Sequence, residues 1–188
     1  MDKPKVVILC GGEGTRLKEE TEFIPKPLVR VGNMPILWHI MKHYASYGYT
    51  DFILCLGYKG EMIKNFFLNY ELMNNDFTLN LKSNTEKVIN HTNYLEDWKI
   101  TFADTGLKSE TGTRIKKIEK YIDGDTFFMT YGDGVSDVDI NKLLEHHKKM
   151  GKIATLTAIH PISKFGMIKL DDNIIEYFKA TTSMISTG

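Results

Sequence analysis

The sequence predicts a three-layer α/β fold, in which a mostly parallel, twisted sheet carries helices on both faces. Residues Val6 to Cys10 form a continuous apolar, β-branched run that stops at Gly11-Gly12, which is typical of a strand buried on both faces. Similar runs alternate along the chain with segments whose apolar residues recur at helical spacing, and this alternation favours parallel strands joined by helices. Ligands of such sheets bind beyond the carboxyl ends of the strands. The residues just after each strand are therefore the candidates for function.

The remaining elements follow the same alternation. Pro35 is placed to open a helix, and Gly48 is placed to end it. Further strands are expected at 52–56, 100–103, 127–131 and 154–159, with a hairpin formed by 167–170 and 174–177. Helices are expected where apolar residues recur at helical spacing. The four such stripes are Ile36, Leu37, Ile40, Met41 and Tyr44; Met62, Ile63, Phe66, Phe67 and Tyr70; Ile115, Ile118 and Ile122; and Ile140, Leu143, Leu144 and His147. Residues 71 to about 99 are rich in Asn and predict irregular structure or an excursion from the sheet.

Composition narrows the range of partners. The 188 residues fit one domain, and we expect 1–188 to form a single domain. There are 24 Lys plus Arg and 24 Asp plus Glu, a balance that argues against nucleic acid or an anionic membrane as the main partner. The N-terminus carries no signal-peptide pattern, and no apolar run approaches transmembrane length. Cys10 and Cys55 lie in apolar runs, so we expect reduced core thiols in a cytoplasmic protein.

The loop after the first strand has the composition of an anion-binding site. Glycines at 11, 12 and 14 leave backbone N–H groups bare, and Arg16 adds a charged fork that suits phosphate. Lys26 stands between two prolines, which aim its ammonium group at little further entropic cost. A loop that only joins strand to helix is the alternative, but it does not explain the Arg and the bracketed Lys. Two known phosphate-binding motifs do not match this loop. The dinucleotide motif requires Gly where Leu17 stands, and the kinase-type motif requires Gly-Lys-Ser/Thr where Leu17-Lys18-Glu19 stands.

Two later loops complete the candidate site. Asp133 lies between glycines just after a strand, where a carboxylate can approach Mg²⁺ and phosphates, although Gly-Asp-Gly is also common in turns. The loop from Asp104 to Arg114 offers short hydroxyls and an arginine that can meet a pyrimidine nucleotide; its alternative is a solvated loop that caps the next helix. His39 and His43 have helical i, i+4 spacing but no third ligand nearby, so we interpret them as core and surface histidines.

These motifs resemble a known family. Gly-Gly-x-Gly-Thr-Arg-Leu at 11–17, followed by Pro25-Lys26-Pro27, is similar to the signature of sugar-1-phosphate nucleotidyltransferases, and 32–60 resembles the glucose-1-phosphate cytidylyltransferase branch. The resemblance covers almost the whole chain. It implies a Rossmann-like fold and a homo-oligomer that uses Mg²⁺ to transfer a cytidylyl group from CTP to glucose 1-phosphate, in nucleotide-sugar and polysaccharide biosynthesis. It implies catalytic roles for Arg16, Lys26 and Asp133, with Asp133 as the metal ligand. The implied nucleotide-binding residues are Leu9, Cys10, Gly11, Gly12, Glu13, Gly14, Thr15, Arg16, Lys26, Ser109, Arg114 and Gly132.

The chain departs from the family pattern at three points. Thr113 replaces the second glycine of Thr-Gly-Gly-Arg, which bears on base specificity. The Glu-Lys-Pro expected near Phe178-Lys179-Ala180 is absent, and a second metal-binding aspartate is expected only beyond Gly188. We therefore expect a domain that is truncated relative to the family. Two alternatives stay open: a cytidylyltransferase for another phosphorylated acceptor, and a non-catalytic nucleotide-binding module.

Overall fold

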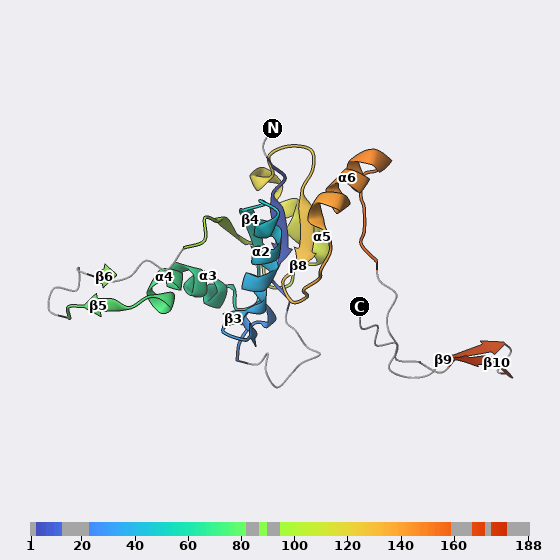
Figure 1. Ribbon diagram of the computed structural model, residues 1–188, viewed down its shortest axis with the longest axis horizontal. Coiled ribbons are helices and arrows are strands. Elements are labelled where there is room, and N and C mark those ends of the chain that lie inside the picture. The colour runs from blue at the N-terminus through green and yellow to red at the C-terminus, as the bar shows by residue number, and fades with distance from the viewer. Residues whose placement is uncertain are drawn as a thin grey trace, which may run out of the picture. The chain divides into compact units, whose positions relative to one another are not determined.

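The computed structural model describes residues 3–12, 23–81, 87–89, 95–158, 167–171 and 174–179. It divides into two compact units, Met1–Leu144 and Glu145–Gly188, and each is described by itself. The first unit, whose colours run from blue to yellow-orange in Figure 1, is built on a four-stranded sheet with the order β7-β4-β1-β8. Its strands are β1 (Val6–Leu9), β4 (Asp51–Leu56), β7 (Lys99–Asp104) and β8 (Phe128–Tyr131). All of their pairings are parallel, as the sequence predicts.

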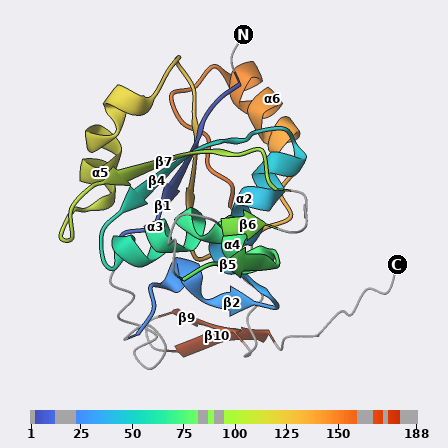
Figure 2. The same cartoon turned by 90° about the vertical axis from the view of Figure 1, so that its left-hand side faces the viewer.

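Helices cover both faces of this sheet. Helix α2 (Ile36–Ser46) lies on one side together with the start of α6 (Ile140–Met150), and α5 (Thr111–Lys117) lies on the other (Figure 2). Helix α3 (Gly60–Leu68) adds Ile63 to the α2 side, and the 3-10 turn η2 (Glu119–Tyr121) follows α5. The three-layer α/β fold class is confirmed.

The strand β1 shows why its sequence is apolar throughout. Val6 and Ile8 belong to the core on the α2 side, whereas Val7 and Leu9 belong to the core on the α5 side. Because both faces of the strand are covered, all four side chains are buried and no polar alternation is possible. Helix α2 begins and ends where the sequence predicts. It follows Pro35, and shortly after its end comes Gly48, whose φ of +81° is a conformation that glycine adopts most readily.

Smaller elements decorate the first unit. The segment after the glycine loop contains the turn η1 (Lys26–Leu28) and the two-stranded pair β2 (Arg30–Val31) and β3 (Met34–Pro35). Helix α4 (Tyr70–Asn74) leads into the antiparallel pair β5 (Phe77–Leu79) and β6 (Lys87–Ile89), which is separate from the main sheet. An excursion at 71–99 is thus confirmed, but it is more ordered than the sequence suggests.

The second unit contains one confirmed prediction and one that is wrong. Strands β9 (Met167–Asp171) and β10 (Ile174–Lys179) pair antiparallel, as the expected hairpin does. The strand expected at 154–159 is not formed by its described residues, 154–158. A strand needs a partner for its backbone groups, and no described strand pairs with this segment. Apolar side chains in and just before this segment are exposed to solvent: Leu156 is 87% exposed, and Ile153 is fully exposed.

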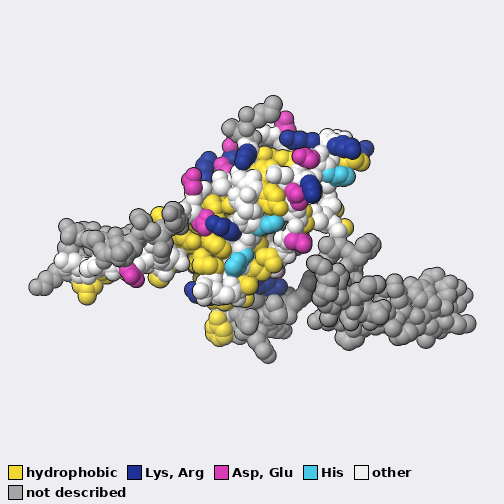
Figure 3. Space-filling view, in the orientation of Figure 1, with side chains coloured by type: hydrophobic (Ala, Val, Ile, Leu, Met, Phe, Trp, Pro, Cys, Tyr) yellow, Lys and Arg dark blue, Asp and Glu magenta, His cyan; other side chains and the backbone are white. Residues whose placement is uncertain are grey.

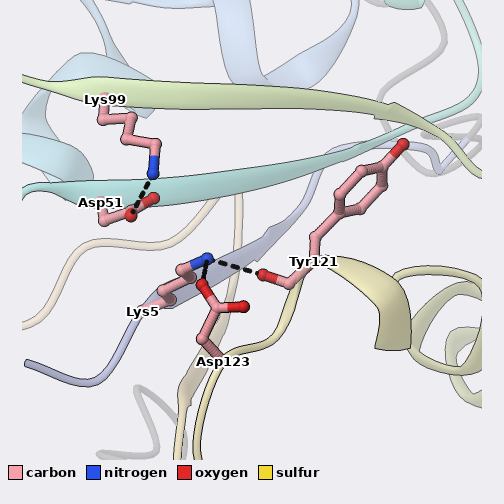
Figure 4. Close-up of polar contacts among 5 residues, drawn as sticks. All are labelled: Lys5, Asp51, Lys99, Tyr121 and Asp123. Atoms are coloured by element: carbon pink, nitrogen blue, oxygen red, sulfur yellow. Dashed lines mark hydrogen bonds and ion pairs between the residues drawn. The ribbon is translucent and has the colours of Figure 1, made fainter. Parts of the chain in front are cut away.

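Charged contacts gather at the amino ends of the strands, the edge opposite the predicted site. Lys5 donates to the carbonyl of Tyr121 at 2.8 Å and pairs with Asp123, while Lys99 pairs with Asp51 at 3.2 Å (Figure 4). On the face drawn in Figure 3, basic and acidic side chains of the described residues are interspersed. Within the described ranges, no helix has both the length and the apolar character needed to span a membrane.

Candidate functional site

A cavity of about 240 Å³ lies where the sheet analysis expects a ligand, at the carboxyl ends of β1 and β8. It is formed within the first unit and brings together predicted residues from four separate segments of the chain. The predicted residues that line it are Leu9, Cys10, Gly11, Gly12, Lys26, Ser109, Arg114 and Asp133. Glu13, Gly14, Thr15 and Arg16 lie outside the described residues. Gly132 is buried beside the cavity and does not line it.

The two glycines after β1 stand in different surroundings. The sheet ladder continues to Cys10, whose N–H donates to the carbonyl of Cys55 at 3.0 Å. Gly11 is buried against the guanidinium of Arg114, whereas a Cβ added at Gly12 would meet none of the described residues within 4 Å. Gly12 therefore provides exposed backbone beside the cavity, while Gly11 is required by packing.

Lys26 and Asp133 both line the cavity and form an ion pair with each other. Lys26 Nζ lies 3.7 Å from Asp133 Oδ2, with the lysine side chain 22% exposed and the aspartate 45%. The turn η1 holds Lys26, and its backbone closes where Leu28 N–H donates to the carbonyl of Pro25 at 2.8 Å. A partly exposed cation beside a partly exposed anion can exchange this mutual contact for a phosphate and a metal ion.

The donor set near Asp133 suits Mg²⁺ only in combination with a ligand. Within the described ranges, no group of three or more His, Cys, Asp or Glu is placed to hold a metal. Mg²⁺ in nucleotide sites is commonly held by one or two carboxylates together with substrate phosphates. A half-exposed carboxylate that lines a cavity together with a lysine and exposed glycine backbone fits that arrangement.

The glycine before Asp133 fixes the position of this carboxylate. Gly132 N–H donates to the carbonyl of Leu9 at 3.0 Å, which ties the β8 loop to β1. A Cβ at Gly132 would lie 3.0 Å from Cys10 Sγ, 3.1 Å from Pro27 Cγ and 3.2 Å from Leu9 O. Gly132 therefore lets the glycine loop, the Lys26 turn and the Asp133 loop approach closely.

Arg114 forms the base of the cavity wall. It is 5% exposed, and its guanidinium donates to the carbonyls of Gly11 at 3.0 Å and Leu56 at 3.1 Å. It also donates to Thr105 Oγ1 at 2.7 Å and to the carbonyl of Leu107 at 3.2 Å. This arginine, which reaches the cavity from α5, is therefore heavily engaged by the protein itself.

The hydroxyl of Ser109 is oriented by two neighbours. Its Oγ donates to the carbonyl of Thr105, and it accepts from Lys117 Nζ at 3.2 Å. Because the single hydroxyl proton is already used, the capacity that remains on this oxygen is that of an acceptor.

Both cysteines are free and buried. Burial raises the pKa of the Cys55 thiol from 9.0 to about 11, with Arg114 opposing the rise. Burial also raises the pKa of the Cys10 thiol, and the neighbouring Cys55 and Asp133 add to the effect. Both thiols therefore stay protonated near neutral pH, and Cys10 contributes to the cavity wall as an apolar group.

Sequence reasoning left four lining residues out of the predicted set: Pro27, Glu110, Thr111 and Tyr131. Each lies within two residues of a predicted residue, so the pattern that located the loops also located these positions. The two histidines of α2 bind backbone instead of each other. His39 Nε2 contacts the carbonyl of Val31 at 2.9 Å, and His43 Nε2 contacts that of Val138 at 2.9 Å.

Comparison with known proteins identifies the family of the chain. The family model described as nucleotidyl transferase matches residues 5–180. A probable glucose-1-phosphate cytidylyltransferase of Bacillus subtilis is 45% identical over 179 residues, which cover 95% of this chain and 69% of that protein. The glucose-1-phosphate cytidylyltransferase of Salmonella typhimurium is 46% identical over 189 residues, covering 98% and 73% respectively.

Solved structures extend the comparison to the fold. A putative glucose-1-phosphate thymidylyltransferase from Bacillus anthracis, solved with sucrose, matches with a TM-score of 0.60 at 17% identity, over 96% of this chain and 65% of that one. At that identity the match concerns the fold alone. The family model and the two bacterial relatives carry the assignment further: the chain belongs to the nucleotidyl transferase family.

Proposed function

We propose that this protein transfers the cytidylyl group of CTP to a sugar 1-phosphate, with glucose 1-phosphate as the acceptor, and releases pyrophosphate. The observation that carries the proposal is the meeting of Lys26, Asp133 and the exposed backbone of Gly12 around one cavity at the carboxyl ends of parallel strands. The names of the two bacterial relatives supply the nucleotide and the acceptor. Cytoplasmic location and homo-oligomeric assembly stay predictions of the sequence.

The reaction requires one bond to form and one to break. A phosphate oxygen of the sugar 1-phosphate attacks the α-phosphorus of CTP, and the bond between this phosphorus and the oxygen bridging to the β-phosphate breaks. The electron pair of the broken bond leaves with pyrophosphate. No covalent enzyme intermediate is needed, so the protein acts by positioning and by stabilising charge.

Each residue of the cavity has a role in this scheme. Lys26 neutralises the α-phosphate as charge develops, and the backbone N–H groups around Gly12 bind phosphate oxygens. Asp133 would hold Mg²⁺, which when bound supplies positive charge beside the phosphates. Arg16, outside the described residues, is proposed to stabilise the departing pyrophosphate.

The polarity of Ser109 supports the choice of cytosine. Cytosine presents an exocyclic amine, which donates, where uracil presents a carbonyl, which accepts. The spare capacity of Ser109 Oγ is that of an acceptor, so it complements cytosine and leaves uracil unpaired. A mismatch of this kind costs roughly 1–3 kcal/mol.

A Lys26→Ala variant tests the assignment. We expect it to lower turnover about a hundredfold or more, as the removal of other preorganised charge-stabilising groups does, and to weaken CTP binding much less. Pyrophosphate release with CTP and a panel of sugar phosphates gives the turnover, and calorimetry gives CTP affinity. Equal losses in both quantities would make Lys26 a plain binding residue. CTP binding without pyrophosphate release from any acceptor would favour the non-catalytic module, and release with an acceptor other than glucose 1-phosphate would favour the alternative enzyme.

A further inference from the structure

The guanidinium of Arg114 has no spare terminal donor. Its two terminal nitrogens carry four N–H groups, and the structure gives these nitrogens four acceptors. Nη1 donates to Leu56 O and Thr105 Oγ1, and Nη2 donates to Gly11 O and Leu107 O. A nucleotide that took one of these donors would have to displace a buried protein acceptor.

The acceptors lie at the ends of three neighbouring strands. Gly11 follows β1, Leu56 is the last residue of β4, and Thr105 follows β7, and these strands are adjacent in the sheet order. The ordinary ladder ends close by, where Thr105 N–H donates to the carbonyl of Leu56 at 3.0 Å. One planar cation therefore continues the cross-strand bonding past the point where the ladder stops.

Two glycines pack closely against this arginine, and Gly57 also packs against the backbone of Gly11. A Cβ at Gly11 would overlap Arg114 Nη1 and lie 2.5 Å from Cζ, and a Cβ at Gly57 would lie 2.7 Å from Nη1. The carbonyl of Gly11 also accepts from the N–H of Tyr58 at 3.3 Å. Gly11 is thus held from two sides, and the arginine is one of them.

The charge of Arg114 is solvated by neutral groups. Its four acceptors are three carbonyls and one hydroxyl, and no carboxylate of the described residues forms an ion pair with it. A buried cation with neutral partners keeps its positive field at the cavity wall. It can attract an anionic ligand without touching it.

We infer that Arg114 is a positioning residue that clamps the carboxyl ends of β1, β4 and β7 and so sets the position of the backbone at Gly11, where the glycine loop begins. It acts on a bound nucleotide through the backbone of that loop, and base recognition belongs to the hydroxyl and backbone groups around Ser109. The clamp itself is a property of the ligand-free fold. Its effect on CTP rests on the proposed function.

A double-mutant cycle tests the clamp without any ligand. Gly11→Ala, Arg114→Ala and the double variant are unfolded in urea, and their midpoints are compared with that of the parent chain. We expect each single variant to lower the midpoint and the double variant to lose less than the sum, because the Cβ no longer meets a guanidinium. Gly12→Ala is the matched control, since its Cβ is more than 4 Å from Arg114 and, chain neighbours aside, from every other residue in the described ranges, and its shift should add to that of Arg114→Ala. Full additivity in the Gly11 cycle would overturn the clamp.

A binding measurement separates positioning from contact. Arg114→Lys is compared with the parent chain for CTP and for UTP, well below the unfolding midpoint of the variant. Positioning through the glycine loop predicts that both nucleotides lose affinity by the same factor, about tenfold or more. Loss for one base only would make Arg114 a base contact, and no loss would make it merely structural; either result overturns the inference. If the parent chain binds neither nucleotide, the proposed function fails while the urea cycle still decides the clamp.

Discussion

Replacing the two glycines beside Asp133 by alanine provides a matched pair of perturbations. The Cβ of Gly132→Ala would meet three neighbours at 3.0–3.2 Å, namely a buried sulfur, a proline ring and a backbone carbonyl. None of them is the end of a long flexible side chain, so these neighbours must give way by a few tenths of an ångström. The Cβ of Gly134→Ala would meet nothing within 4 Å in the part of the chain that the structure describes. The described glycines with positive φ include neither residue, so alanine fits the backbone at both positions.

The magnitudes follow from these surroundings. Overpacking of this kind typically costs about 1–3 kcal/mol. Alanine at a compatible backbone position restores about 0.4–1 kcal/mol by restricting the unfolded chain, and this gain is common to both variants. The two variants should therefore differ in unfolding free energy by about 1–3 kcal/mol, with Gly132→Ala less stable than the parent chain and Gly134→Ala at least as stable.

Urea unfolding followed by tryptophan fluorescence measures this difference. Trp98 packs against the core of the first unit, and its ring lies 6.0 Å from that of Trp38, so both report on the sheet that carries the site. If the two variants have the same unfolding free energy within error, the close approach at Gly132 has no energetic consequence. The account of how the Asp133 loop is held against β1 would then be refuted.

Three further perturbations address other parts of the molecule. Ser109→Ala should reduce the preference for CTP over UTP by about 1 kcal/mol, as measured by competition binding, because it removes the acceptor that uracil cannot use; an unchanged ratio would contradict the assignment. Lys5→Met should lower the unfolding free energy by about 1 kcal/mol through loss of the bond to Tyr121, while CTP affinity measured by calorimetry stays unchanged, because Lys5 lies at the opposite edge of the sheet. The free energy of unfolding should also fall as the pH rises from 9.0 to about 11. Burial raises the pKa of Cys55 in the folded state, so the protonated thiol stabilises the fold fully only below the pKa of the unfolded chain, and this stability is lost as the pH rises through the folded-state pKa. The pH dependence of the urea midpoint should be shallower in Cys55→Ala, and an equal slope would rule out the thiol.

Local sequence was sufficient for the parts of the fold whose pattern is local. The strand at Val6–Leu9 is marked by its continuous apolar sequence, and the helix after Pro35 by its apolar stripe and by the proline and glycine that flank it. Their positions could therefore be predicted within one or two residues. The segment 154–158 also has an apolar sequence, but a strand is completed by a partner that the sequence of the segment does not contain. Phe77 and Leu79 in β5 are exposed and share no face with a core, which explains why no periodicity marked them.

The site divides in the same way. Residue types at loop positions located the cavity, because parallel strands bring their carboxyl ends to one edge. The residue types do not reveal which hydrogen-bond partners each side chain has in the folded protein. The acceptors of Arg114 come from positions 11, 56, 105 and 107, and only the folded chain shows that they converge on one guanidinium.

The contact between Lys26 and Asp133 has a thermodynamic consequence for how the cavity fills. With 3.7 Å between the ammonium and the carboxylate, an anion that approaches Lys26 is repelled by Asp133, and a cation that approaches Asp133 is repelled by Lys26. Each ligand neutralises the group that opposes the other. Binding of a triphosphate and of a divalent cation is therefore cooperative in both directions by the same factor, since linkage between two sites is reciprocal. In the loaded cavity, Lys26 and Asp133 each exchange their mutual contact for a ligand of opposite charge.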